Sequence, residues 1–127
     1  MIKGADMSRT LTLTFYGLPP VANDRLGWRA KAERIKTYRE SARLRAQSWR
    51  NEHGGATFAR YRVSAQISTQ GRPIDPTNRP EYVKPLLDGV VAAGLIADDS
   101  ETYVEMGTFT HTRGPRGITM VVEEAAV

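Results

Sequence analysis

The stretch RPIDPTNRPEYVKPLLDGV, residues 72–90, marks the point where the chain passes from a strand pattern into a helix pattern. It places Asp75 and Asn78 ahead of the helix and Lys84 and Asp88 on it. Two interpretations of this stretch stay open. One is a turn that leads into an ordinary amphipathic helix, and the other is a cation site that handles phosphates.

Pro85 sets the expected start of that helix, because a proline deep in a helix removes an amide donor and clashes with the preceding turn. We therefore expect the helix to begin near Tyr82 or Val83. Lys84 and Asp88 then lie one turn apart on one face. The opposite, buried stripe is expected to contain Val83, Leu87, Val90, Val91 and Gly94.

Strand and helix periodicities continue outward from this stretch in both directions. Alternating apolar residues predict half-buried strands, and apolar positions at helical spacing predict one long helix. The ranges expected are a strand over Leu11–Gly17, a helix from about Ala30 to Trp49, and strands over Arg60–Ser68, Thr102–Thr110 and Gly117–Glu123. The last two strands are expected to form a hairpin through HTRGPRG. The order β-α-β-α-β-β predicts a single α+β domain, residues 1–127, with a mainly antiparallel sheet.

The composition excludes several classes of protein. The chain has 127 residues, of which 40% are hydrophobic and 25% charged, which fits one folded domain rather than a disordered or membrane protein. No secretory signal is apparent at the N-terminus. There is no cysteine, and His53 and His111, both expected at the surface, are the only histidines. We therefore expect a cytoplasmic protein without a thiolate metal site.

Positive charge is concentrated between residues 25 and 50, where nine Lys and Arg face only two Glu. Such a cluster favours a polyanionic partner, although a solvated helix face explains it equally well. The residues that we expect to contact DNA are Arg25, Arg29, Lys31, Arg34 and, outside the cluster, Arg72.

Carboxylates lie at two junctions in this region, where a predicted strand leads into the helix and where the helix leads into the next strand. Asp75 follows one strand, and Asp98 and Asp99 precede the next. If those strand ends are neighbours, the carboxylates can converge on Mg²⁺, which needs only one or two of them and keeps waters and phosphates as its other ligands. Lys84 would then add a point charge for the same phosphate.

The run DPTNRPEYVKPLLDGVVAAGLIADDSETYVE, together with LPPVAND earlier in the chain, resembles the RusA family of Holliday-junction resolvases. The shared features are an aspartate-asparagine turn, a lysine and an aspartate four residues apart, a glycine ending the helix and a following Asp-Asp pair. They fall here on Asp75 and Asn78, Lys84 and Asp88, Gly94, and Asp98 with Asp99.

This resemblance implies a homodimeric endonuclease that binds four-way DNA junctions and nicks them with Mg²⁺, or with Mn²⁺. The family's acidic triad falls on Asp75, position 77 and Asp99, with Lys84 as the catalytic lysine. Position 77 is Thr77 here, and the segment before Lys84 is longer by the three residues RPE. Asp98 or Asp88 is then the candidate for the missing metal ligand.

Two alternatives to the nuclease stay open. A chain of the same fold that lost catalysis through Thr77 would bind branched DNA, or serve in DNA packaging, without cutting. A small sheet-forming dimerisation domain would leave the basic helix merely solvated.

Overall fold

The computed structural model describes residues 9–21, 25–96 and 104–125. Its elements follow in the order β1 (Thr10–Tyr16), α1 (Trp28–Glu52), β2 (Tyr61–Thr69), a 3-10 turn η2 (Pro76–Asn78), α2 (Arg79–Ala92), β3 (Val104–Arg113) and β4 (Gly117–Glu124). The two helices and four strands expected from the sequence are therefore confirmed in their order, and the fold is α+β.

The four strands form one mixed sheet in the order β1-β4-β2-β3. Strand β4 runs antiparallel to both β1 and β2, whereas β2 and β3 are parallel. The sheet is thus mainly antiparallel, as predicted.

The predicted hairpin between the last two strands is wrong, because β2 lies between β3 and β4. The inner face of β2 is buried, with Tyr61, Val63 and Ile67 all at 0% exposure, as expected for a strand in the interior of a sheet. The turn after β3 instead crosses the end of β2, where the Gly114 amide donates to the Thr69 carbonyl at 3.0 Å.

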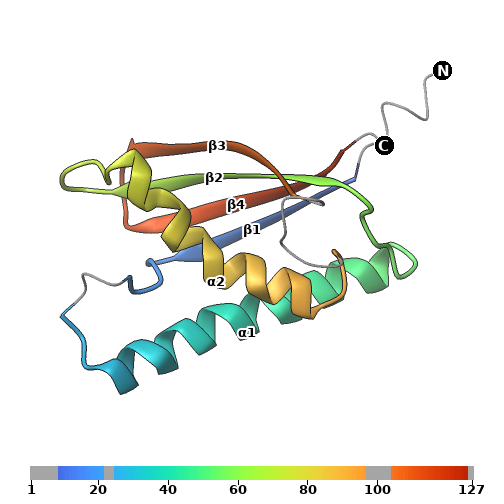
Figure 1. Cartoon of the computed structure of the whole chain (residues 1–127), viewed down its shortest axis with the longest axis horizontal. Helices are drawn as coiled ribbons and strands as arrows, with labels where there is room; N and C mark the ends of the chain where they lie inside the picture. Colours follow the sequence, from blue (N-terminus) through green and yellow to red (C-terminus); the bar gives the residue numbers. More distant parts are fainter. Residues whose placement is uncertain (1–8, 22–24, 97–103, 126–127) are drawn as a thin grey trace.

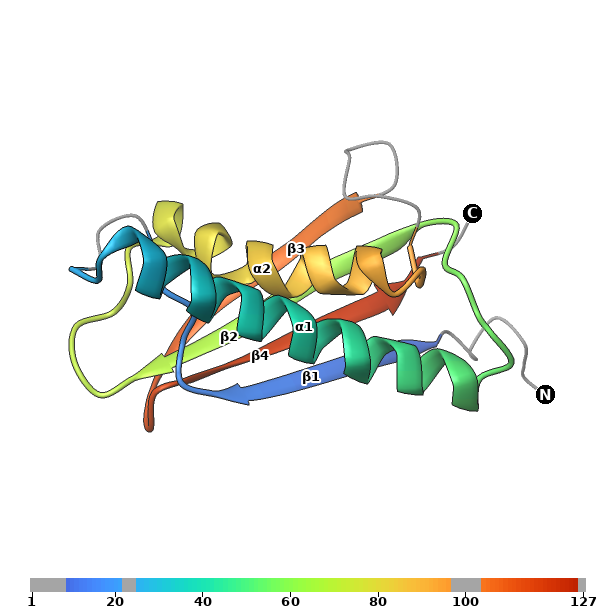
Figure 2. The same cartoon turned by 90° about the horizontal axis from the view of Figure 1, so that it is seen from below.

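Both helices pack on the same face of the sheet (Figures 1 and 2). The core between the layers contains the inward side chains of three strands: Leu11, Leu13 and Phe15; Tyr61, Val63, Ala65 and Ile67; Ile118, Met120 and Val122. Tyr38 and Trp49 of α1 pack against this core. No described element covers the opposite face, where the hydroxyls of Thr14 and Thr119 lie 3.2 Å apart.

The two helices approach each other closely at Gly89. A Cβ atom at this position would lie 2.3 Å from the Arg39 carbonyl oxygen and 2.8 Å from the Ala42 Cβ. Ala42 and Ala46 are the fully buried residues of α1. Small side chains on both helices therefore let α2 lie directly on α1, and this contact sets the direction in which α2 runs.

Helix α2 begins earlier than the sequence predicted, at Arg79 rather than near Tyr82 or Val83. Pro80 lies in the first turn, where a proline costs no helical hydrogen bond. Pro85 lies inside the helix and is buried, which corrects the expectation that it excludes helix on its N-terminal side. The pyrrolidine ring is buried, and burial of its apolar surface offsets part of the cost of the lost amide donor.

Gly94 also departs from its predicted place in the buried stripe. It follows the end of α2, is exposed, and adopts a φ of +84°, the conformation in which glycine commonly ends a helix. Among the described residues, neither helix combines the length and the apolar character that crossing a membrane requires.

Candidate nucleic-acid interface

Asp75 caps the 3-10 turn that precedes α2. Its Oδ1 accepts hydrogen bonds from the Thr77 amide at 2.9 Å and from the Thr77 hydroxyl at 2.8 Å. These two bonds, the amide first, and then the nearby Arg79 hold the pKa of Asp75 below its usual value. The side chain is exposed. Asp75 is therefore an ionised, accessible carboxylate at neutral pH, and Thr77 is its hydrogen-bond donor.

Arg79 ties this turn to the sheet. Its Nε donates to the Ile74 carbonyl at 3.0 Å, and its Nη1 donates to the Phe109 carbonyl of β3 at 2.9 Å. Sequence reasoning missed this role, and nothing in the RPE segment distinguishes Arg79 from a solvated arginine. The guanidinium therefore links Ile74, the residue before Asp75, to β3, which is an edge strand of the sheet.

Lys84 and Asp88 lie on one face of α2, as predicted, and form an ion pair of 2.9 Å. Their side chains are 56% and 40% exposed, so the pair itself contributes little to stability. Asn78 is exposed and makes no side-chain capping bond to α2. The predicted approach of Lys84 to a phosphate held at Asp75 stays a prediction.

Asp98 and Asp99 lie outside the described residues. The described residues on either side pair at the start of β2: Ile96 forms a bridge with Phe58, and Val104 pairs with Tyr61. Asp75 instead follows the other end of β2, a strand whose nine residues span about 30 Å. The described residues that flank Asp98 and Asp99 thus lie at the opposite end of β2 from Asp75. The convergence of Asp75 with the Asp98–Asp99 pair within one chain stays a prediction. Among the described residues, no group of three potential metal ligands comes together.

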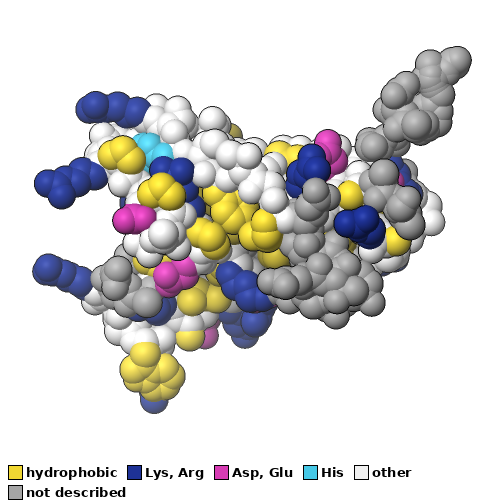
Figure 3. Space-filling model, turned by 45° about the horizontal axis from the view of Figure 1, so that its top comes forward, with side chains coloured by type: hydrophobic (Ala, Val, Ile, Leu, Met, Phe, Trp, Pro, Cys, Tyr) yellow, Lys and Arg dark blue, Asp and Glu magenta, His cyan; other side chains and the backbone are white. Residues whose placement is uncertain are grey.

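The predicted DNA-contacting residues lie at the end of the molecule where both helices begin. Arg25, Arg29, Arg34 and Arg72 are exposed, and Lys31 is half-buried. Figure 3 shows Lys and Arg side chains projecting from this end, at the left of the view. We name it the basic end.

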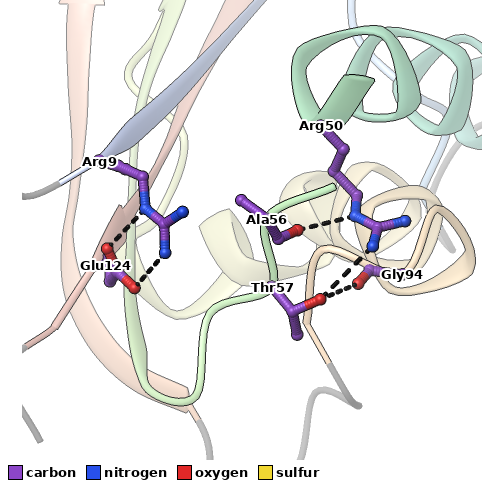
Figure 4. A network of polar contacts seen from close by, with 6 residues as sticks. All are labelled: Arg9, Arg50, Ala56, Thr57, Gly94 and Glu124. Carbon is purple, nitrogen blue, oxygen red and sulfur yellow. Dashed lines mark hydrogen bonds and ion pairs between the residues drawn. The ribbon is translucent and has the colours of Figure 1, made fainter. Parts of the chain in front are cut away.

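Three arginines in the later part of the basic run have partners within the fold. Arg43 pairs with Glu40, and Arg45 donates to the Thr14 carbonyl of β1 at 2.5 Å. Arg50 donates to the Ala56 carbonyl at 2.8 Å (Figure 4). It also donates to the Ala93 carbonyl at 3.0 Å. Arg43, Arg45 and Arg50 therefore have partners within the fold, and their contact with DNA stays a prediction.

Two neighbouring hollows open at the basic end, and Arg116 lines both. The Tyr82 hollow, of about 640 Å³, is lined among others by Gly71, Arg72, Ile74, Tyr82, Pro115 and Arg116. The Tyr38 hollow, of about 480 Å³, is lined among others by Gly17, Pro20, Arg25, Arg34, Tyr38 and Arg116. The first adjoins the predicted metal site in sequence, because Ile74 directly precedes Asp75.

Gly17 shapes the Tyr38 hollow. Its φ is +99°, and a Cβ there would lie 2.9 Å from the Tyr38 hydroxyl oxygen. Burial raises the pKa of Tyr38, and the nearby Arg34 and Arg116 partly offset that rise. Both arginines therefore lie near the hydroxyl of Tyr38, which lines the same hollow.

Sequence reasoning missed three residues of this end. Arg116 lies in the turn that was taken for a hairpin, and the topology brings it beside Arg34 and Arg72. Tyr16 and Trp28 are 91% and 75% exposed at the end of β1 and the start of α1. Exposed aromatic side chains beside arginines are typical of surfaces on which nucleic-acid bases stack.

Neither histidine lines the two hollows, although His111 contacts Thr69, which lines the Tyr82 hollow. His53 is exposed and stacks on Trp49 at 3.8 Å between ring centroids. His111 is half-buried, with its Nε2 2.6 Å from the Thr69 hydroxyl.

Comparison with known proteins adds no functional assignment. No model of a known protein family matches the chain, and no curated protein matches it. The similarity to the RusA family therefore rests on the residues quoted above.

Proposed function

We propose that this chain is a metal-dependent, structure-specific endodeoxyribonuclease that cuts four-way DNA junctions. One observation carries the proposal beyond the sequence resemblance: the exposed, ionised Asp75 stands at the same end of the fold as an arginine-rich surface. A carboxylate among arginines combines a metal ligand with a grip on the phosphates that the metal would act upon.

Asp75 fits the requirements of Mg²⁺. The metal accepts one or two protein carboxylates and fills its other positions with water and phosphate oxygens, and Asp75 supplies an exposed carboxylate whose pKa is lowered. When bound, Mg²⁺ or Mn²⁺ supplies charge neutralisation and an activated water for phosphodiester hydrolysis. Asp99 and Asp98 are the further ligands that we propose from the resemblance, with Asp88 as the substitute.

The remaining residues have roles in binding. Arg72 directly precedes the turn and neutralises phosphate charge beside Asp75, and Lys84 approaches the scissile phosphate as a point charge. Thr77 keeps Asp75 in place through its amide and hydroxyl. In this proposal, Thr77 positions a ligand that it does not itself replace.

The proposed assembly is a symmetric homodimer acting in the cytoplasm of a bacterial cell or of a phage-infected host. A four-way junction offers two equivalent strands, and a two-fold dimer offers two equivalent sites. One carbonyl on each edge strand already accepts from a helix arginine, Thr14 from Arg45 and Phe109 from Arg79. These arginines disfavour edge-to-edge pairing of two sheets at those positions.

The second candidate is a protein that binds branched DNA without cutting it. Both Thr77 bonds go to one Asp75 oxygen, which is also the geometry of a simple capping turn. In that case the basic end binds DNA and Asp75 serves only the start of α2.

The test is incubation of the protein with a synthetic four-way junction at graded Mg²⁺ and Mn²⁺ concentrations. We expect symmetric nicking by the wild type and at least a hundredfold loss in Asp75→Asn, with unchanged junction binding. Glu52→Gln removes an exposed carboxylate at the other end of α1 and should cut normally. Cleavage by Asp75→Asn at the wild-type rate would contradict the metal role, and binding without nicking by the wild type would favour the second candidate.

Thr77→Asp separates two versions of the proposal. If Thr77 stands in an empty ligand position, the added carboxylate should lower the Mg²⁺ concentration needed for nicking. If Asp98 or Asp88 has taken over, the Thr77→Asp variant should gain little, and Asn at the substitute position should abolish cleavage but leave binding intact.

A further inference from the structure

Arg116 joins the two hollows of the basic end into one surface. It lies in the short turn between β3 and β4 and lines both hollows. Its carbonyl accepts the Gly17 amide at 2.8 Å, which fastens this turn to the loop after β1. The backbone of Arg116 is therefore held in place, while its exposed side chain stands between the hollows.

The arginines around the hollows keep their charge for a ligand. Among the ion pairs between described residues, none includes Arg25, Arg34, Arg72 or Arg116. Four guanidinium groups gathered without carboxylate partners repel one another and attract an anion. Because they span two adjoining hollows, the ligand that neutralises them best carries more than one phosphate.

The lining of the Tyr82 hollow suits a nucleoside better than a phosphate alone. Ile74, Tyr82 and Pro115 give it an apolar wall, and Arg72 and Arg116 supply the charge. A base and its sugar present flat apolar surface, and stacking on an aromatic side chain favours a base whatever its identity. The volume of about 640 Å³ is ample for one nucleoside.

We propose that the two hollows form one track for a single strand of DNA, in which Arg116 binds the phosphate between them and the Tyr82 hollow accepts one unstacked nucleoside. The proposal rests on the proposed function for the identity of the ligand. Bases at a branch point leave the stack more readily than bases within a duplex, so this hollow would favour branched over linear DNA. The strand would then pass Asp75, which directly follows Ile74.

Arg116→Ala tests the phosphate contact, with Arg39→Ala as the matched control. Arg39 is an exposed arginine in the middle of α1, outside both hollows. Fluorescence anisotropy with a labelled four-way junction and with a single-stranded oligonucleotide, over a salt series, measures both variants. Arg116→Ala should weaken binding roughly tenfold at low salt and flatten the log-log salt slope by about 0.9, whereas Arg39→Ala should change affinity less than twofold.

Gly71→Leu tests the nucleoside contact, with Gly114→Leu as its control. Neither glycine has a positive φ, and an added Cβ at either position meets nothing within 4 Å, so both variants should fold. Gly71 lines the Tyr82 hollow, whereas Gly114 lies in the β3–β4 turn. Gly71→Leu should reduce junction affinity roughly tenfold, the effect of losing one stacked base, and leave the salt slope unchanged.

The outcomes separate this inference from the proposed function. If the wild type nicks junctions but Arg116→Ala and Gly71→Leu bind like their controls, the track is overturned and the nuclease stands. If both variants weaken binding but the wild type cuts nothing with either metal, the nuclease is overturned and the track stands. A wild type that binds no DNA at 50 mM salt, a condition at which phosphate contacts are strong, overturns both.

Discussion

The arginines at the two ends of this molecule differ in their surroundings. At the basic end, Arg34 and Arg116 line open hollows. At the other end, Arg9 holds the Glu124 carboxylate with two bonds of 2.9 and 2.8 Å, and Arg50 binds main-chain carbonyls (Figure 4). The same residue type is thus exposed around open hollows at one end and bonded within the fold at the other.

The difference arises from the acceptors that each end offers. Helix α1 ends in a glycine-containing turn and α2 ends close by, so carbonyls without helical partners meet there. Arg50 donates to three of them, at Gly55, Ala56 and Ala93. At the basic end the helices begin instead, and helix starts expose amides rather than carbonyls. Arg79 binds two main-chain carbonyls there, whereas the exposed Arg34 and Arg116 line a hollow.

The largest expected effect is that of Arg50→Ala on stability. It leaves three carbonyls without their charged donor, and we expect the free energy of unfolding to fall by about 3 kcal/mol. Urea denaturation followed by circular dichroism measures this change. Arg50→Lys should recover only part of it, because an ammonium group lacks the forked geometry that reaches several carbonyls.

Arg25→Ala combined with Arg34→Ala is the counterpart at the basic end. Both side chains are exposed in the Tyr38 hollow, so stability should change by less than about 0.5 kcal/mol. DNA affinity should fall by roughly 2 kcal/mol at low salt, with a slope flatter by about 1.8, because two phosphate contacts are lost. If this variant and Arg50→Ala lost equal stability, the claim that the arginines of the two ends differ in their contribution to stability would be wrong.

A smaller effect concerns pH at the framework end. The Arg9 hydrogen bonds lower the pKa of Glu124, and burial acts in the opposite direction. A lowered pKa in the folded state contributes stability above the unfolded value of about 4.3, and this contribution is lost as pH falls through the lower folded value. Both side chains are partly exposed, so we expect no more than about 1 kcal/mol.

Comparison of the wild type with Glu124→Gln over pH 2 to 7 checks this expectation. The variant should be less stable near neutral pH, and the difference should disappear in strong acid. Glu52→Gln should follow the wild-type curve. A difference that persists unchanged at pH 2 would mean that Glu124 acts through packing rather than through its charge.

Much of the fold was predictable because it depends on local patterns. The alternation of Leu11, Leu13 and Phe15 gave β1 its buried face, as observed. Which strands pair could not be predicted in this way, because the hairpin interpretation used only the short turn and not the competing burial of β2. Pro85 misled the helix prediction because a local rule was overridden by packing against the core.

For the candidate site, the sequence identified residues but not their neighbours. Asp75 and Arg72 were named from the motif, and the structure gives them a shared end of the molecule. Arg116 was missed because its role depends on β3 and β4 flanking β2. The hydrogen bonds of Arg50 could not be predicted, because its acceptors lie on a loop and at the end of a second helix.

The smallest expected effect is that of Thr77→Val. This variant tests whether the Thr77 hydroxyl helps to lower the pKa of Asp75 and so to keep this carboxylate ionised. Valine keeps the shape of threonine and the amide donor but removes the hydroxyl that binds Asp75 Oδ1. The amide is the larger cause of the lowered pKa, so the pKa of Asp75 should rise and still remain below its usual value. An NMR titration of the Asp75 carboxyl carbon measures this directly. Thr57→Val removes a hydroxyl that donates to the Gly94 carbonyl at the framework end and should leave Asp75 unchanged. If Thr77→Val left the pKa of Asp75 unmoved, the amide and Arg79 would suffice to keep the carboxylate ionised, and Thr77 would have no part in preparing it for a metal.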